Sequence, residues 1–305
     1  MTQLRREGPI TVIGATGQQG GAVLEALLSQ GLTVRAVTRN SHAENSRALT
    51  ARGIEVVSAD LDDHDSVRAA FDGAAAAFAM ATHDGPEGTE REIAHGRTIA
   101  RAAGEAHLPH LVYSSVGGAD RHSGIPHFES KRRIEEFLSE EVPVTLVRPT
   151  FFMETLRWMI RRDGNNTMLA LPISKATPLQ MISVRDIGRV AARLLAAADP
   201  DVPPVEIASD ELTGEQIADR LTDRLGSPVT YVQVPLEVLG DDEDLKAMFR
   251  WLDQPPSFQA DFARTRELAP DPEDLSRWLI RQLSLGQRVD PFGPHRPGIV
   301  GAAVK

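Results

Sequence analysis

The sequence contains no cysteine. This absence excludes disulfides, cysteine-ligated iron–sulfur clusters, thiolate metal sites and cysteine nucleophiles. No run of about 18 apolar residues occurs, so we expect neither a membrane span nor a membrane partner. Residues 1–9 hold no apolar stretch, which argues against a secretory signal. These absences together predict a protein of the cytoplasm.

Positive charge is scarce relative to negative charge. The 305 residues include 33 Lys and Arg against 43 Asp and Glu, which gives a net charge of −10. An acidic surface repels phosphate backbones, so direct nucleic-acid binding is disfavoured. The apolar fraction of 41% is ordinary for a globular protein and excludes disorder of the whole chain. At about 150 residues per domain, the length favours two domains, or one large domain with an appended lobe.

The first half alternates short apolar runs with amphipathic runs. Strands are predicted at 10–13, 33–37, 54–58, 74–81, 110–114 and 144–147, and helices at 18–30, 41–52, 63–71, 87–106 and 128–140. Such alternation with short links indicates right-handed crossovers and an α/β fold with a doubly wound parallel sheet of Rossmann type. We assign this NADP-binding domain to residues 1–150.

The alternation loosens after residue 149. Helices are predicted at 151–162, 184–198, 213–225, 242–251 and 272–283, the last with Asp271 as cap and Pro272 in its first position, and strands at 179–183, 205–207 and 229–234. We therefore predict a smaller, mostly helical lobe at 151–286 for a substrate or partner. Residues 179–198 are expected to return to the first domain, and 287–305 form a Gly/Pro-rich tail.

A glycine-rich segment lies between the first strand and the first helix. It reads Gly14-Ala15-Thr16-Gly17-Gln18-Gln19-Gly20. Glycines at this spacing allow a tight turn and close approach of backbone N–H groups to a pyrophosphate, which the helix N-terminus also attracts. The alternative is a tight turn with no ligand. The GxxGxxG spacing resembles the extended and atypical short-chain dehydrogenases/reductases.

The end of the second strand selects the cofactor. An acid there would bind the ribose 2′-OH of NAD, whereas a cation favours the 2′-phosphate of NADP. Residues 37–41 contain no acid and include Arg39, whose guanidinium can pair with a phosphate. We therefore predict NADP(H), the alternative being a solvated surface arginine. Asp60, after the third strand, contacts the adenine amino group or acts as a cap or turn residue.

The fifth strand ends at Ser114 and is followed by His127-Phe128-Glu129-Ser130-Lys131. Short-chain reductases carry Tyr-x-x-x-Lys here, where the lysine lowers the tyrosine pKa so that the phenol transfers a proton during hydride transfer. This chain keeps Lys131 and has His127 at the tyrosine position, on the same helical face. We predict both as catalytic residues. The alternatives are a helix-start histidine and a surface lysine.

These motifs together resemble the NmrA-like family. The resemblance rests on Gly14–Gly20, on residues 37–40 and 127–131, on Arg148-Pro-Thr-Phe-Phe-Met-Glu154 and on Ile182-Ser-Val-Arg-Asp-Ile-Gly188. Residues 248–251, Met-Phe-Arg-Trp, resemble the redox-sensor branch of that family. The similarity extends from about Pro9 to Leu283.

The resemblance implies a Rossmann fold with a smaller C-terminal lobe that binds NADP(H). It implies cofactor contacts at Gly14, Thr16, Gly17, Gln18, Gln19, Gly20, Arg39, Lys131, Pro149, Thr150, Phe151 and Phe152, and chain position adds Asn40, Asp60, Ala81, Thr82 and Ser114. No metal site is predicted, because His107 and His110 have no third ligand nearby.

Two functions are compatible with this resemblance. Some family members are sensors of the NADPH/NADP ratio that act through a protein partner, and others reduce quinones or other small carbonyl compounds. The missing tyrosine favours the sensor, towards which the sequence leans. An apolar wall permits the reductase, unless it is the core of the small lobe. The wall consists of Phe151, Phe152, Met153, Leu156, Trp158 and Met159.

Overall fold

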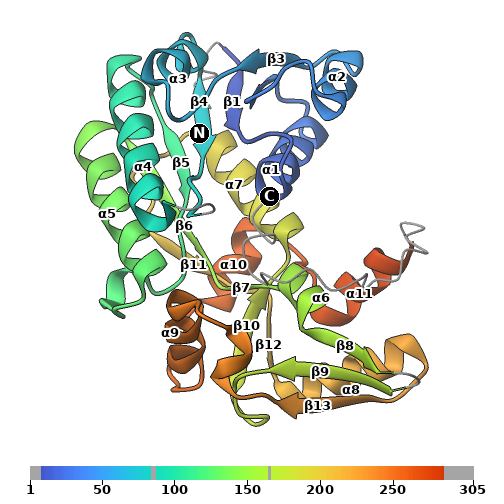
Figure 1. The fold of residues 1–305 in the computed structure, drawn as a ribbon. Helices are drawn as coiled ribbons and strands as arrows, with labels where there is room; N and C mark the ends of the chain where they lie inside the picture. The colour runs from blue at the N-terminus through green and yellow to red at the C-terminus, as the bar shows by residue number, and fades with distance from the viewer. Residues whose placement is uncertain (1–7, 84–86, 164–165, 285–305) are drawn as a thin grey trace.

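The computed structural model describes residues 8–83, 87–163 and 166–284. Its centre is a seven-stranded parallel sheet in the order β11-β6-β5-β4-β1-β2-β3 (Figure 1). The strands are β1 (Ile10–Ile13), β2 (Val34–Thr38), β3 (Glu55–Ser58), β4 (Ala76–Ala79), β5 (Leu111–Ser114), β6 (Val144–Pro149) and β11 (Val205–Ile207). This confirms the predicted α/β sheet and adds β11 at its edge. The predicted tail, 287–305, lies outside the described residues.

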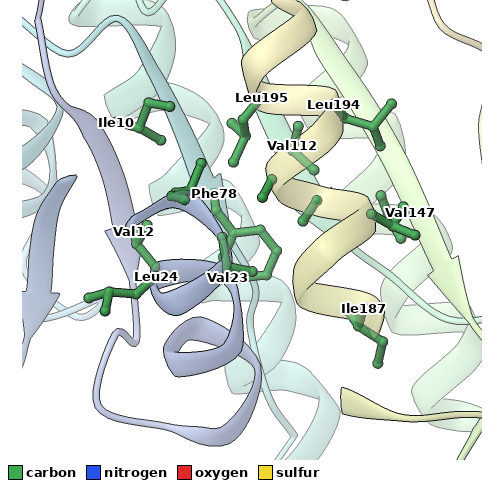
Figure 2. Packing of buried hydrophobic residues seen from close by; sticks show 14 of the residues in the cluster. Ile10, Val12, Val23, Leu24, Phe78, Val112, Val147, Ile187, Leu194 and Leu195 are labelled. Atoms are coloured by element: carbon green, nitrogen blue, oxygen red, sulfur yellow. The ribbon is translucent and has the colours of Figure 1, made fainter. Parts of the chain in front are cut away.

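Helices cover both faces of this sheet. One face carries α1 (Gln18–Ser29), α2 (Glu44–Ala51) and α7 (Val184–Ala197), and the other carries α3 (His64–Phe71), α4 (Gly88–Glu105) and α5 (Pro126–Glu141). Figure 2 shows side chains of α1 and α7, such as Val23 and Leu195, packed with Val12, Phe78 and Val112 of the strands. The sheet is therefore buried on both sides, as its continuous apolar strands predict.

The strand order fixes where a ligand binds. The chain runs outward from β1 to β2 and β3, and then crosses back to β4 on the other side of β1. Open α/β sheets bind ligands at such a switch point, beyond the carboxyl ends of the strands. The loops after β1 and β4 begin at Gly14 and Met80, so the glycine-rich turn and Ala81 lie at this edge.

The smaller lobe contains helices and two three-stranded sheets. Its strands are β7 (Phe151–Phe152), β8 (Ile160–Asp163), β9 (Asn166–Leu171), β10 (Pro178–Ile182), β12 (Asp210–Thr213) and β13 (Val229–Gln233), and its helices are α6 (Leu156–Met159), α8 (Gly214–Leu225), α9 (Glu243–Leu252) and α11 (Leu275–Ser284). Helix α10 (Phe262–Leu268) follows α9 but packs through Leu268 into the core of the main sheet. Within the described ranges, no helix combines the length and the apolar character needed to cross a bilayer.

One predicted element of this lobe is wrong, and the start of another is misplaced. Residues 151–162 are not one helix, because β7 pairs with β10 and β8 pairs with β9, and only α6 between them is helical. The last helix begins at Leu275 instead of 272. Asp271 has a φ of +56° and pairs with Arg277, so it does not take the extended conformation of a helix cap.

Residues 179–198 divide between the two parts of the molecule. Strand β10 pairs with β7 and β12 in a small sheet, whereas α7 packs on α1 and on the central sheet. The helices α1 and α7 approach closely at Gly188, where an added Cβ would lie 2.5 Å from the carbonyl carbon of Ala22. Glycine at this point therefore sets the separation of the two helices.

Candidate functional site

The glycine-rich turn has the geometry of an anion site. Gly14 has a φ of +68°, and a Cβ on Gly20 would lie 2.2 Å from the Gly14 carbonyl oxygen, so the turn requires glycine at both positions. Gly17 caps α1, no side chain bonds to this cap, and the first turn contains no acid. The first N–H groups of the helix are thus available to a pyrophosphate, which the helix dipole favours.

A buried hydrogen bond ties this turn to β5. Ser114 Oγ donates to Gln19 Oε1 at 2.7 Å, and both residues are buried. Thr16 is exposed, and Gly17 and Gln18 are half-buried. This bond therefore holds the two ends of the predicted cofactor site together, while the cofactor contacts of these residues stay predictions.

Arg39 stands beyond the end of β2 and is exposed. In the described part of the chain no acidic side chain pairs with it, so its charge is available to a phosphate. Neighbouring Asn40 accepts a hydrogen bond from the backbone of His42 through Oδ1 (2.9 Å). Asp60 accepts one from the backbone N–H of Asp62 (3.1 Å), which stabilises its own turn. The predicted adenine contact of Asp60 is untested by this geometry.

Lys131 lies in the interior and not on the surface. Its Nζ donates to the carbonyl oxygen of Ala81 at 2.5 Å, lies 3.0 Å from Glu92 Oε1 and donates to Tyr113 Oη at 3.4 Å. Ser130 Oγ also donates to Glu92. Burial disfavours the ammonium, but the oxygens of Glu92 and Tyr113 outweigh it, so the pKa of Lys131 is raised and the side chain is charged.

Tyr113 does not replace the tyrosine that the motif lacks. Its hydroxyl lies beside Lys131, as a catalytic tyrosine would, but its side chain is fully buried within β5. Burial raises the pKa of Tyr113. Because no part of this residue reaches the surface, it cannot contact a substrate. The proton donor at this site must be sought elsewhere.

His127 is half-buried near the start of α5, four residues before Lys131. Its Nδ1 lies 2.7 Å from Oδ1 of Asp244, which lies in the first turn of helix α9 in the smaller lobe. Its ring also stacks on His83, with centroids 5.0 Å apart and an angle of 24° between planes. Burial and the nearby His127 lower the pKa of His83. The donor atoms of His83, His127 and Asp244 lie within 4.8 Å of one another.

The segment 149–152 carries the chain from β6 into the smaller lobe. Thr150 is buried, and its Oγ1 donates to the carbonyl oxygen of Ile207 at 3.1 Å. Phe151 belongs to the core of the lobe, and Phe152 packs against the main core. Core packing therefore accounts for most of the predicted apolar wall, namely Phe151, Met153, Leu156 and Met159.

Glu92, His83 and Asp244 are site residues that sequence reasoning missed. Glu92 had a detectable signal, because it is a charged residue in register with Gly96 and Ile99 on the apolar face of a predicted helix. Asp244 and His127 are 117 residues apart. No local pattern connects them, and the same is true of His83.

Comparison with known proteins places this site in a family. The family model described as the NmrA-like family matches residues 6–279. The chain is 36% identical over 157 residues to the NmrA-like family domain-containing oxidoreductase FrzB of a Cladobotryum species, covering 48% of this chain and 47% of that protein. It is 26% identical over 275 residues to oxidoreductase malD of Malbranchea aurantiaca, covering 79% and 81%. The chain thus spans about half the length of the first of these relatives.

Solved structures agree on the fold. NmrA, a negative transcriptional regulator in complex with NAD, matches with a TM-score of 0.77 at 20% identity, covering 92% of this chain and 98% of that one. The Citrobacter triphenylmethane reductase complexed with NADP(H) matches with a TM-score of 0.76 at 19% identity, covering 90% and 99%. With its glycine-rich turn, its switch-point topology and a family match over nearly the whole chain, this protein belongs to the NmrA-like family of NAD(P)-binding Rossmann proteins.

Proposed function

We propose that the protein is an NADPH-dependent reductase of a small, mostly apolar substrate such as a quinone or a dye. One observation carries this proposal. His127 occupies the tyrosine position of the reductase motif, its ring nitrogen Nδ1 lies 2.7 Å from Asp244, and its side chain is only partly buried. Tyr113, the other candidate beside Lys131, is fully buried.

The choice of NADP(H) follows from the charge at the end of β2. Arg39 is exposed and has no acidic partner among the described residues, and no acid stands where NAD would need one. A guanidinium can make two charge-assisted hydrogen bonds to a 2′-phosphate. The similar triphenylmethane reductase is complexed with NADP(H) and the similar NmrA with NAD, so the selectivity for NADP(H) is part of this proposal.

In this proposal, the glycine-rich turn, Lys131 and His127 have separate roles in the reduction. When bound, NADPH supplies the hydride. The glycine-rich turn binds its pyrophosphate through backbone N–H groups. Lys131 orients the nicotinamide ribose by exchanging one of its present partners, Ala81, Glu92 or Tyr113, for a ribose hydroxyl. His127 gives a proton to the substrate atom adjacent to the one that receives hydride.

The second candidate is a regulator that responds to the NADPH/NADP ratio through a protein partner. One observation favours it. Three interior oxygens lie within 3.4 Å of Lys131 Nζ, so the residue that orients the ribose in the reductases is engaged in the interior. A protein of this kind binds NADPH without consuming it.

A substrate panel separates the two candidates. Naphthoquinone, an azo dye, a triphenylmethane dye and an aromatic aldehyde are each mixed with NADPH, and loss of the reduced nicotinamide absorbance is followed. We expect substrate-dependent loss with at least one class, and no such loss in Lys131→Ala. Tight NADPH binding by calorimetry with no turnover on any class would overturn the reductase in favour of the regulator.

A further inference from the structure

Asp244 and His127 form a hydrogen-bonded pair that joins the two lobes. The Asp244 Oδ1 atom accepts from the backbone N–H of His127 at 3.2 Å and lies 2.7 Å from its Nδ1. One oxygen thus fixes both the position of the residue and the rotation of its ring. Burial disfavours the Asp244 carboxylate, but hydrogen bonding and charge from His127 outweigh it and lower its pKa. An ionised carboxylate only accepts, so Nδ1 carries the proton of this bond.

The other ring nitrogen of His127, Nε2, is available for proton transfer. In the described part of the chain, no hydrogen bond joins Nε2 of His127 to another residue. The side chain is 14% exposed, so it is neither sealed nor fully solvated. A ring held through Nδ1 with Nε2 unengaged is the arrangement in which a histidine passes protons in hydrolases, where a carboxylate fixes the tautomer.

Helix α9 is held firmly enough for this role. Trp251, at the other end of α9, packs edge-on against Phe128, with ring centroids 5.3 Å apart, and against Phe258 at 5.2 Å. Phe128 is fully buried and follows His127 in α5. The start of α5 therefore contacts α9 at two points, through the polar pair His127–Asp244 and through the aromatic pair Phe128–Trp251.

From this geometry we infer that Asp244 is the positioning residue for His127 and makes Nε2 its proton-donating nitrogen. This inference rests on the proposed reductase function. In the step, the substrate would gain a hydride, that is two electrons and a proton, from bound NADPH, which would become NADP⁺. The Nε2–H bond of the imidazolium breaks, and its proton goes to the neighbouring substrate heteroatom. The ring is left neutral with its proton still on Nδ1 and donated to Asp244, and solvent restores the proton at Nε2.

The other charged and titratable groups around the ring do not take this role. Lys131 and Glu92 are committed to each other in the interior. Tyr113 is inaccessible. His83 stacks on the ring and, with its lowered pKa, is a neutral neighbour near pH 7. Asp244 is thus the charged partner of the ring itself.

A metal ion is the competing occupant. The donor atoms of His83, His127 and Asp244 lie within 4.8 Å of one another. Donors on a tetrahedral zinc ion are about 3.4 Å apart, as bonds of about 2.0–2.1 Å require. The direct 2.7 Å contact between His127 and Asp244 already satisfies Nδ1 without an ion. The geometry therefore favours the hydrogen-bonded pair.

Turnover and NADPH affinity are measured for the parent, for Asp244→Asn and Asp244→Ala, and for Asp242→Ala as a matched control. Asp242 caps the same helix through the N–H of Leu245 without contacting His127. With the best substrate of the panel, we expect both Asp244 variants to lower kcat on the order of 100-fold with unchanged NADPH affinity. Added formate should restore part of the activity of Asp244→Ala, and Asp242→Ala should keep parental kcat.

Nuclear magnetic resonance of protein labelled with nitrogen-15 histidine tests the ring directly, with His127→Phe used to assign its signals. We expect Nδ1 of His127 to be protonated in the parent and this preference to be lost in Asp244→Asn. A parent ring protonated only at Nε2 would overturn the inference. So would parental kcat in both Asp244 variants, or equal losses in Asp242→Ala and Asp244→Ala without formate rescue.

The outcomes also separate this inference from the proposed function. Loss of turnover in His127→Phe with parental turnover in Asp244→Asn removes Asp244 and leaves the reductase intact. Absence of turnover on every substrate removes the reductase, and the tautomer of His127 then decides the positioning inference by itself. Stoichiometric Zn²⁺ binding that requires His83, His127 and Asp244 would replace the inference with a metal site.

Discussion

Glu92 Oε1 lies 3.0 Å from Lys131 Nζ, and both side chains are buried away from bulk water. Glu92 is fully buried on α4 and Lys131 is 8% exposed on α5. A buried ion pair of this kind adds little to the free energy of unfolding relative to an apolar pair of similar size. Removing one partner, however, leaves the other charge buried without a counter-charge. The pair therefore makes the position of Lys131 depend on a residue of another helix.

Glu92→Gln should destabilise the fold by about 3–5 kcal/mol, because it strands the Lys131 ammonium in the interior. Urea or thermal unfolding measures this change. The exposed Glu90 in the same helix gives the matched control Glu90→Gln, which should lie within about 0.5 kcal/mol of the parent. The double variant Glu92→Gln with Lys131→Met should recover much of the loss, since no charge is then buried. Parental stability of Glu92→Gln would contradict this account.

The same pair has a predictable pH dependence. The pKa of Lys131 is raised in the folded protein. Its contribution is therefore fully present below the unfolded value of about 10.4 and is lost as pH rises through the folded value. The stability difference between the parent and the double variant Glu92→Gln with Lys131→Met, which has neither charge, should thus be equal at about pH 6 and about pH 9. A difference that changes between these values would show that Lys131 is not held as an ammonium in the parent.

Arg39→Ala should remove the selectivity for NADPH over NADH. Hydrogen bonds to charged groups contribute about 1.5–3 kcal/mol, so the parent should prefer NADPH by roughly ten- to a hundredfold. The variant should bind NADH with nearly parental affinity. Calorimetric titration of both cofactors measures this, with the exposed Arg68 of α3 giving the control Arg68→Ala. Equal affinities for the two cofactors in the parent would refute the assignment.

Gly188→Ala tests the close packing of α1 and α7. Alanine improves helix propensity by about 0.8–1.0 kcal/mol, so a helix without steric constraint would be stabilised. Here the new Cβ would lie 2.5 Å from backbone atoms of Ala22, and we expect net destabilisation of about 1–3 kcal/mol. Gly21 is the matched control, because its Cβ would meet its nearest atom at an ordinary 3.5 Å. Opposite signs of the two changes in unfolding free energy are expected, and two stabilised variants would exclude the steric account.

The sequence predicts the Rossmann part well because its signals are local. Apolar β-branched runs mark the strands and amphipathic runs mark the helices between them, so even the alanine-rich segment 74–81 is correctly predicted to hold a strand, β4. Residues 151–162 carry apolar residues at mixed spacing, and there long-range pairing decides the outcome: Phe151 lies opposite Met181 in one sheet, and Ile160 lies opposite Leu169 in another. Tertiary pairing overrides local propensity at such positions.

The candidate site likewise contains residues that the sequence predicts and residues that it does not. His127 and Lys131 are found from a spacing of four residues, which any helix converts into a shared face. Their partners Asp244 and Glu92 come from other helices, and the sequence holds no distance that links them. The chemistry of the motif is therefore readable from the chain, but the groups that orient it are not.

His127→Phe and Lys131→Ala decide whether the protein is a reductase or a regulator. In a reductase, positioned acid catalysis contributes about 10²–10⁴-fold, so His127→Phe should lower turnover by that order while NADPH affinity stays nearly constant. Lys131→Ala should damage both quantities, because it removes the ribose contact and leaves the buried Glu92 unpaired. In a regulator, His127→Phe has no effect on NADPH affinity and only Lys131→Ala weakens it. Each variant is assayed for NADPH affinity by calorimetry and for turnover on the best substrate of the panel. Undiminished turnover in His127→Phe would remove His127 from the chemistry and leave Lys131 or bound water as the proton source, since Tyr113 is fully buried in the sheet.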